Sequence, residues 1–243
     1  MTSYLNGKYT SQKKNLFEKP HAYSKGYSEF YKLTFTVTPD VLIPRPETEL
    51  LIDEVLRQLP IHSPLTIIDL GTGSGNIAIS LSKNSNVKII AIDISKKALR
   101  VALRNAKKHD VEKKITFIQS NLLTNKSIKK CVYPPFFIVA NLPYVPSSRI
   151  HTLDASVRDF EPHRALDGGN DGFDLYRKLF SQIKKKKIFP EMLLAEIDDT
   201  QSEIAKKEIR KYFPNAKIDI KQDLTGRTRF MYISLKILTH LKP

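Results

Sequence analysis

The chain has 243 residues, of which 40 are Lys or Arg and 25 are Asp or Glu, so its formal net charge is +15. This length suits one α/β domain with a short extension, and the 41% of hydrophobic residues suffice for a packed core. No run approaches the roughly 18 consecutive apolar residues of a membrane span, and the polar start lacks the apolar segment of a secretory signal. The single cysteine excludes a disulfide framework and a Cys-rich metal site. We therefore expect a cytoplasmic protein with no membrane contact and no bound metal.

The N-terminal part is predicted to hold an arm, a hairpin and a first helix. Residues 1–19 have the composition of a basic, weakly structured arm, and residues 27–37 alternate enough for a hairpin or an edge strand. Pro44-Arg45-Pro46 predicts a rigid turn, after which proline and acidic residues favour the start of a helix. The chain is accordingly divided into a basic arm with a short hairpin, 1–40, and a main domain, 41–243.

Apolar strands alternate with helices through the main domain. We expect strands over 66–70, 88–94, 115–119, 136–141 and 192–197, and helices over 76–83, 95–109, 172–186 and 199–212. A long polar loop is expected over 142–171, and Cys131 beside a strand is expected to be a buried thiol. Two closing strands, near 216–222 and 229–236, have no helix between them. The pattern predicts an α/β fold with a mostly parallel seven-stranded sheet and an antiparallel hairpin at one edge.

Glycine is scarce, with nine residues, and six of them fall in two short clusters. The first cluster, in segment 69–75, follows a buried strand and leads into a helix, where backbone N–H groups face a polar or anionic ligand. Asp93 ends the next strand, where an acid accepts hydrogen bonds from ribose; the alternative for Asp93 is a helix N-cap. Gly73, Gly75 and Ala78 also satisfy a dinucleotide fingerprint. The loop therefore predicts an adenosine cofactor and leaves nicotinamide and S-adenosylmethionine both open.

The tetrapeptide Asn141-Leu142-Pro143-Tyr144 follows the strand over 136–141, so it should face the same crevice as the glycine loop. The Asn141 side-chain oxygen and the Leu142 carbonyl can together accept both N–H bonds of a planar –NH₂ group. That grip turns the nitrogen toward an electrophilic methyl, and Tyr144 offers an aromatic face to the planar group. The alternative is an Asx turn closed by Pro143. In this position the tetrapeptide favours methyl transfer.

Six stretches carry a resemblance to a known family. They are VLIPRPETE (41–49), DLGTGSG (69–75), AID (91–93), NLPYV (141–145), EPHRALDGG (161–169) and DLTGR (223–227). Together they resemble the HemK/PrmC family, the release-factor glutamine methyltransferases, within the Rossmann-like class I S-adenosylmethionine-dependent methyltransferases. The resemblance implies methyl transfer from S-adenosylmethionine to the side-chain amide nitrogen, N5, of the glutamine in the Gly-Gly-Gln motif of peptide-chain release factors. It also makes 41–243 the methyltransferase catalytic domain.

The resemblance implies a role for each matching residue. The residues that hold the cofactor would be Gly71, Thr72, Gly73, Ser74, Gly75, Asp93, Asn121, Leu122 and Asn141. The residues that grip the glutamine amide would be Asn141, Leu142, Pro143 and Tyr144, with Asn141 and Tyr144 as the catalytic pair. The second glycine cluster, Gly168, Gly169 and Gly172, becomes architecture beside the substrate entrance.

The sequence departs from the family pattern in three places. Leu142 stands where the family usually has proline, Asn121 replaces an aspartate near the adenine, and Leu122 occupies a position that is often aromatic. Only a short arm precedes the matching region, so most of the family's N-terminal helical domain is expected to be missing.

Two related substrates stay open as alternatives. An N6-adenine methyltransferase of DNA or RNA grips a similar planar –NH₂ group, and ribosomal-protein glutamine methyltransferases are closer still. The positive charge is consistent with proximity to the ribosome or RNA, and it is equally consistent with a solubility or genome-composition effect.

Overall fold

The computed structural model describes residues 19–60 and 65–235, so most of the predicted basic arm lies outside the described residues. The strands are β1 (Tyr27–Phe30), β2 (Leu33–Thr36), β3 (Thr66–Leu70), β4 (Lys88–Asp93), β5 (Ile115–Gln119), β6 (Phe136–Ala140), β7 (Met192–Glu196), β8 (Lys217–Gln222) and β9 (Thr228–Ser234). The α-helices are α1 (His21–Lys25), α2 (Thr48–Gln58), α3 (Asn76–Asn84), α4 (Lys96–Lys108), α5 (Lys126–Cys131), α6 (Ala155–Arg158), α7 (Asp174–Lys186) and α8 (Ser202–Tyr212). Two 3-10 helices are η1 (Ser147–Thr152) and η2 (His163–Ala165).

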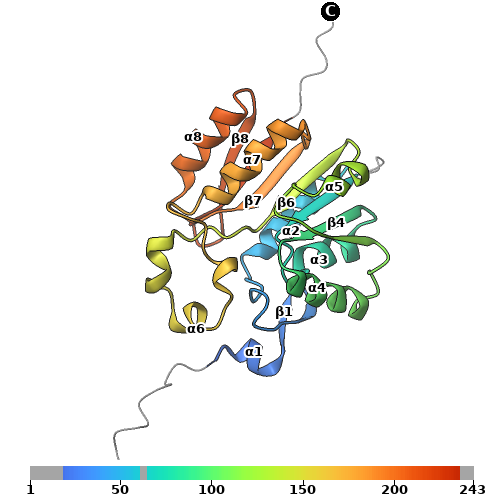
Figure 1. Ribbon diagram of the computed structural model, residues 1–243, viewed down its shortest axis with the longest axis vertical. Coiled ribbons are helices and arrows are strands. Elements are labelled where there is room, and N and C mark those ends of the chain that lie inside the picture. The colour runs from blue at the N-terminus through green and yellow to red at the C-terminus, as the bar shows by residue number, and fades with distance from the viewer. Residues whose placement is uncertain (1–18, 61–64, 236–243) are drawn as a thin grey trace, which may run out of the picture.

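The main sheet has seven strands in the order β5-β4-β3-β6-β7-β9-β8. The first five are parallel, whereas β9 runs antiparallel to both of its neighbours. The predicted fold and its edge hairpin are thus confirmed, and β1 and β2 form the expected N-terminal hairpin as a separate two-stranded sheet. In Figure 1 the carboxyl ends of the parallel strands point toward α6 and the β1 hairpin, so those segments border any site at this edge.

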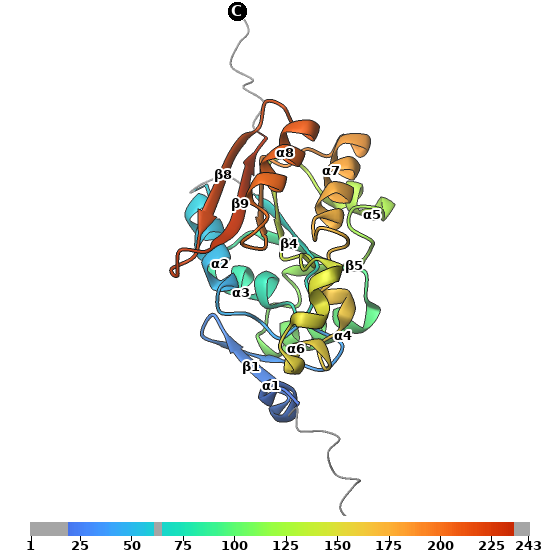
Figure 2. The same cartoon turned by 90° about the vertical axis from the view of Figure 1, so that its left-hand side faces the viewer.

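The two faces of the sheet bury separate clusters because strand residues alternate. On β3, Ile68 and Leu70 pack with α5, α7 and α8, whereas Ile67 packs with α2, α3 and α4. Figure 2 shows α2 and α3 on one side of the sheet and α5 and α7 on the other. Each fully buried isoleucine contributes about 1.5–3 kcal/mol of hydrophobic stabilisation. Both faces being covered explains why the parallel strands are continuous apolar runs.

The structure differs from the expectations in the connections. Helix α5 was not predicted, and Cys131, its last residue, is exposed, so the expectation of a buried thiol is wrong. Only Ile128 of this helix is buried, and Asn125 caps its N-terminus by accepting from the Ser127 N–H. Segment 142–171 contains η1, α6 and η2 in place of one long loop. Helices of three to six residues are too short to show a 3.6-residue apolar period.

Within the described ranges, no helix combines the length and the apolar character that crossing a bilayer requires.

Candidate active site

A cavity of about 700 Å³ opens at the carboxyl edge of the parallel strands. Four strand ends contribute to it, and segments 39–45 and 162–167 close its sides. The predicted site residues that line it are Gly71, Thr72, Gly73, Ser74, Asp93, Asn121, Leu122, Asn141, Leu142 and Pro143. Gly75 and Tyr144 are not among the lining residues. The sequence motifs therefore meet around one space, as their positions after neighbouring strands predict.

The first glycine loop is pinned to the neighbouring strand. The N–H groups of Gly71 and Thr72 donate to the Ile92 carbonyl at 2.8 and 2.9 Å. Gly71 has a φ of +76°, and a Cβ there would lie 3.1 Å from Leu142 Cδ2. A side chain at this position would therefore be strained and would press on the tetrapeptide 141–144.

Gly75 has a packing role. Its Cβ would lie 2.9 Å from Ile79 Cδ1 and 3.1 Å from Ala102 Cβ, where α3 approaches α4. With a φ of +83° it is also the N-cap of α3. Gly75 supports the cavity from behind, and its assignment to cofactor contact stays a prediction.

Asp93 is held by backbone donors. Its Oδ2 accepts from the Gly73 N–H at 3.0 Å and its Oδ1 from the Ser95 N–H at 2.8 Å. The N-cap of α4 is Ser95, whose Oγ accepts from the Ala98 N–H, so the N-cap alternative for Asp93 is wrong. Burial raises the pKa of Asp93, and the two backbone N–H groups oppose that rise. Each carboxylate oxygen keeps a lone pair for a further donor, which fits the two hydroxyls of a ribose.

The part of the cavity wall that follows β5 combines a polar and an apolar residue. Leu122 has a φ of +55°, and its side chain is buried in the core cluster. Asn121 is half-buried, and its side-chain amide makes no hydrogen bond to another described residue. The apolar side chain of Leu122 is suited to the face of a purine, and the free amide of Asn121 is suited to its hydrogen-bonding edge.

The tetrapeptide after β6 presents two free acceptors to the cavity. Asn141 Nδ2 donates to Glu196 Oε2 at 2.9 Å and to Thr48 Oγ1 at 3.1 Å. Within the described part of the chain, neither Asn141 Oδ1 nor the Leu142 carbonyl accepts a hydrogen bond, and both residues line the cavity. The pair is therefore free to receive both N–H groups of a planar amide, and its binding of a substrate amide stays a prediction.

The Tyr144 side chain contacts Glu196, which also holds the Asn141 amide. Its hydroxyl donates to Glu196 Oε1 at 2.9 Å. Burial raises the pKa of Tyr144 well above its usual value, so the phenol remains a protonated donor. The aromatic contact of Tyr144 with the substrate stays a prediction, because its ring is not part of the lining.

The second glycine cluster holds the tetrapeptide in place. A Cβ on Gly168 would lie 2.7 Å from the Pro143 carbonyl oxygen, and one on Gly172 would collide with the Tyr144 carbonyl. Gln201 Nε2 donates to the same Tyr144 carbonyl at 2.9 Å. These glycines are architecture, as expected, since they allow two backbone segments to touch.

An ion pair joins the two sides of the cavity. Arg45 Nη2 lies 2.6 Å from Glu161 Oε1, and Glu161 Oε2 accepts from the Ile43 N–H at 3.2 Å. The Glu161 side chain is 1% exposed and that of Arg45 is 28% exposed. The two most specific stretches of the sequence, 41–49 and 161–169, thus meet through this contact.

Replacing Arg45 by methionine should lower the free energy of unfolding by about 2–3 kcal/mol, because it leaves the Glu161 carboxylate buried without a cation. Urea unfolding would measure the loss. The control is Arg158→Met, which removes an exposed pair with Asp159 and should lower the stability far less. Equal losses in the two variants would contradict a structural role for the buried pair. Adding Glu161→Gln to Arg45→Met should recover part of the stability.

Asp69 is a buried acid beneath the glycine loop. Its Oδ2 accepts from the Thr72 hydroxyl at 2.6 Å, whereas its Oδ1 has no partner among the described residues. Burial raises the pKa of this carboxyl from 3.8 to about 7. The protonated form is therefore favoured in the folded state over the intervening pH range.

The raised pKa predicts a pH-dependent stability. The contribution of Asp69 is fully present below its unfolded pKa of 3.8 and is lost as the pH rises through about 7. The melting temperature of the unmodified chain minus that of Asp69→Asn should therefore fall between about pH 4 and pH 7, since Asn does not titrate. Differential scanning fluorimetry across this range would measure the difference. A constant difference would show that Asp69 stays ionised in the folded protein.

Thr48 and Glu196 are site residues that the sequence analysis missed. Thr48 begins α2, within the stretch 41–49, and Glu196 ends β7. The available signal was an acid at the carboxyl end of an otherwise apolar strand. Glu196 is 1% exposed and fully surrounded by protein, and burial raises its pKa.

Comparison with known proteins finds a methyltransferase domain and similar methyltransferases. A family model described as "Methyltransferase domain" matches residues 61–132. The release factor glutamine methyltransferase of Bacillus cereus is 35% identical over 221 residues, which are 89% of this chain and 77% of that protein. The protein of the same name from Moorella thermoacetica is 38% identical over 212 residues, which cover 86% of this chain and 73% of the relative.

Solved structures share the fold at low identity. The N-terminal domain of human METTL16 in complex with SAH has a TM-score of 0.59 and 13% identity, covering 85% of this chain and 77% of that one. A ribosomal protein L11 methylase from Lactobacillus delbrueckii subsp. bulgaricus has a TM-score of 0.56 and 21% identity, covering 82% and 83%.

Proposed function

Because the chain belongs to the family of release factor glutamine methyltransferases, we propose that its cavity aligns a substrate glutamine with S-adenosylmethionine. The chain is an S-adenosylmethionine-dependent enzyme that methylates the side-chain amide nitrogen of glutamine in a release factor. The observation that carries the site proposal is the pair of free acceptors at Asn141 and Leu142, which line the cavity.

The cavity residues fit the cofactor. The Asp93 carboxylate would receive the ribose hydroxyls, Asn121 and Leu122 would contact the adenine, and the loop 71–74 would lie along the remainder. S-adenosylmethionine supplies an electrophilic methyl group on a positively charged sulfonium. A largely dry cavity would favour a step in which this charge is neutralised.

The amide nitrogen of glutamine is a poor nucleophile because its lone pair is delocalised into the carbonyl. Asn141 Oδ1 and the Leu142 carbonyl would fix both N–H groups in the amide plane and so direct the nitrogen at the methyl. Oriented proximity of this kind supplies roughly 7–11 kcal/mol in favourable cases. The protein thereby acts by alignment. As the nitrogen forms its bond to the methyl group and the bond from that group to the sulfonium breaks, the nitrogen would release one of its two protons through the acceptor oxygen that holds it to solvent.

A direct experiment tests the function. The chain is incubated with S-adenosylmethionine and a full-length release factor, and mass spectrometry locates the modification. We expect one added methyl group on the glutamine of the Gly-Gly-Gln motif. Adenine-containing DNA and RNA serve as parallel substrates. Methylation of nucleic acid in place of the glutamine would overturn the proposal.

We propose that the chain divides near residue 40 into an accessory hairpin segment and the catalytic domain. In the described part, the hairpin packs on the catalytic core. The Thr36 N–H donates to Asn105 Oδ1 of α4 at 2.8 Å, and Phe30 and Phe35 join the cluster of α2 and α3. Such packing lets the hairpin support segment 39–45 at the rim of the cavity.

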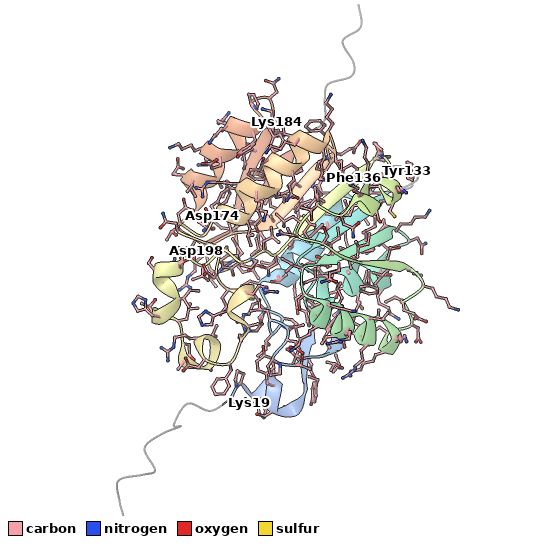
Figure 3. The ribbon with its side chains drawn as sticks, in the orientation of Figure 1. Lys19, Tyr133, Phe136, Asp174, Lys184 and Asp198 are labelled. Carbon is pink, nitrogen blue, oxygen red and sulfur yellow. The ribbon has the colours of Figure 1, made fainter. Side chains whose placement is uncertain are left out.

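We propose proximity to RNA through one basic end of the molecule, and a cytoplasmic location with it, since the substrate works in translation. Segment 126–135 has three lysines, segment 181–190 has four, and neither has an acid. The Lys186 ammonium of the second segment donates to the Thr124 carbonyl, two residues before the first segment. Figure 3 places Lys184 at the top of the molecule and Tyr133 at its upper right, with Asp174 and Asp198 lower on the left.

Replacing Lys129, Lys130, Lys184 and Lys185 by glutamate should weaken binding to ribosomal RNA at least about tenfold, because each lysine neutralises phosphate charge. Filter binding at several salt concentrations would show the loss and a reduced salt dependence. Methylation of a free release factor should not change, since none of these four lysines lines the cavity. Unchanged RNA binding would assign the lysines to solubility.

A further inference from the structure

The buried carboxylate of Glu196 lies behind the substrate-gripping residues and has no part in the mechanism so far. Alternation along β7 turns Leu194 and Glu196 toward α2 and Leu193 and Ala195 toward the opposite face. Strands β6 and β7 pair with Ala140 opposite Ala195, so Asn141 and Glu196 follow at the next register position. The sheet itself therefore places these two side chains together.

All the side chains that hydrogen-bond to the Glu196 carboxylate donate to it. The Thr48 hydroxyl donates to Glu196 Oε2 at 2.7 Å, so its lone pairs are free to accept from Asn141 Nδ2. The Tyr144 hydroxyl donates to the other oxygen, Oε1. An ionised carboxylate only accepts, so every neighbour must turn a donor toward it.

This direction decides which atom Asn141 shows to the cavity. The two ends of an asparagine amide have nearly the same shape but opposite hydrogen-bonding character. With Nδ2 committed to Glu196 and Thr48, Oδ1 is the end that remains for the substrate. A reversed amide would present a donor to the cavity and would place Oδ1 against the carboxylate, where the single Thr48 hydroxyl proton could serve only one of the two acceptors.

We propose that Glu196 is a positioning residue that fixes the orientation of the Asn141 amide and thereby selects a substrate amide over a carboxylate. The proposal rests on the proposed grip by Asn141. A glutamine –NH₂ group supplies the donors that the fixed acceptors need, whereas a glutamate side chain supplies none. Burial raises the pKa of Glu196. The hydroxyl donors of Thr48 and Tyr144 oppose that rise, as does the charge of Arg229, so these neighbours favour the ionised form.

A donor and acceptor exchange tests the proposal. Asn141→Asp alone sets two carboxylates against each other, so turnover should fall about 100-fold or more. Adding Glu196→Gln lets the new amide donate to the carboxylate at position 141, while the amide oxygen accepts from Tyr144. The double variant should therefore turn over at least about tenfold faster than Asn141→Asp alone. In the unmodified chain, Glu196→Gln should instead lower turnover.

The proposal predicts that the effect of Glu196→Gln on turnover changes sign: it is a loss in the unmodified chain and a gain in Asn141→Asp. A residue that only stabilises the fold would lower turnover in both backgrounds, and that result would overturn the proposal. The melting temperature and the dissociation constant for S-adenosylmethionine are measured for the unmodified chain, the two single variants and the double variant. Turnover is then calculated per molecule that binds the cofactor. Full activity of Asn141→Ala would refute the proposed grip itself, whereas loss in Asn141→Ala without a sign change refutes only the role of Glu196.

A second variant keeps the test independent of the exchange. Glu196→Leu has a similar volume and no acceptor, so Asn141 can turn either end of its amide to the cavity. A release factor with glutamate in place of the target glutamine should then inhibit at least about tenfold more strongly than it inhibits the unmodified chain. Thr48→Val, which leaves the carboxylate in place, is the matched control and should shift this inhibition less. Equal inhibition of Glu196→Leu and the unmodified chain would overturn the proposal.

Discussion

Asn141→Ala should lower the turnover of release factor methylation by about 10²–10³-fold, while the dissociation constant for S-adenosylmethionine changes by less than about threefold. The variant deletes Oδ1, one of the two free acceptors that line the cavity. In the proposed grip, the remaining Leu142 carbonyl would hold only one N–H group, and the nitrogen would lose its alignment with the methyl. Steady-state kinetics with saturating cofactor, and calorimetric titration of the cofactor, separate the two effects.

Asn170→Ala is the control for this experiment. Asn170 is exposed in the same loop region and does not line the cavity, so its removal should leave turnover within about twofold. A turnover loss in Asn141→Ala that follows an equal loss of cofactor affinity would assign Asn141 to the cofactor. Undiminished turnover would remove the tetrapeptide from the reaction altogether.

The sheet could be predicted from the sequence because its central strands, β3, β4, β6 and β7, are buried on both faces. Strand β3 has the bounds that the run TIIDL predicts, and the closing hairpin follows from two strands without a helix between them. Helix α5 escaped prediction because it buries only Ile128, so no apolar stripe marks it. The same absence of periodicity led to the wrong expectation for Cys131, which faces outward at the end of that helix.

The cavity residues were predictable as far as they stand at strand ends within motifs. Asp93 and Asn141 satisfy that condition, and both line the cavity. Glu196 does not, since its role depends on the register of β6 against β7 and on the first residue of α2. Contacts between residues 48, 141 and 196 are tertiary, and no local pattern in a single sequence records them.

Asp93→Ala should raise the dissociation constant for S-adenosylmethionine by about 10- to 100-fold, because a hydrogen bond to a charged group contributes about 1.5–3 kcal/mol. The variant removes the proposed ribose acceptor. It also removes the hydrogen bonds that the carboxylate accepts from the Gly73 and Ser95 N–H groups at 3.0 and 2.8 Å, and so loosens the glycine loop. Calorimetric titration of the cofactor would measure the change.

Asp40→Ala provides the matched acid, because Asp40 lines the same cavity but pairs with Lys97 at 3.2 Å and not with the glycine loop. Its removal should weaken cofactor binding by less than about threefold. At saturating cofactor, Asp93→Ala should regain most of its turnover, whereas Asn141→Ala should not, since the lost acceptor acts on the glutamine. Equal weakening by Asp40→Ala and Asp93→Ala would mean that the cavity holds its cofactor through general charge, and the assignment of Asp93 to the ribose would fail.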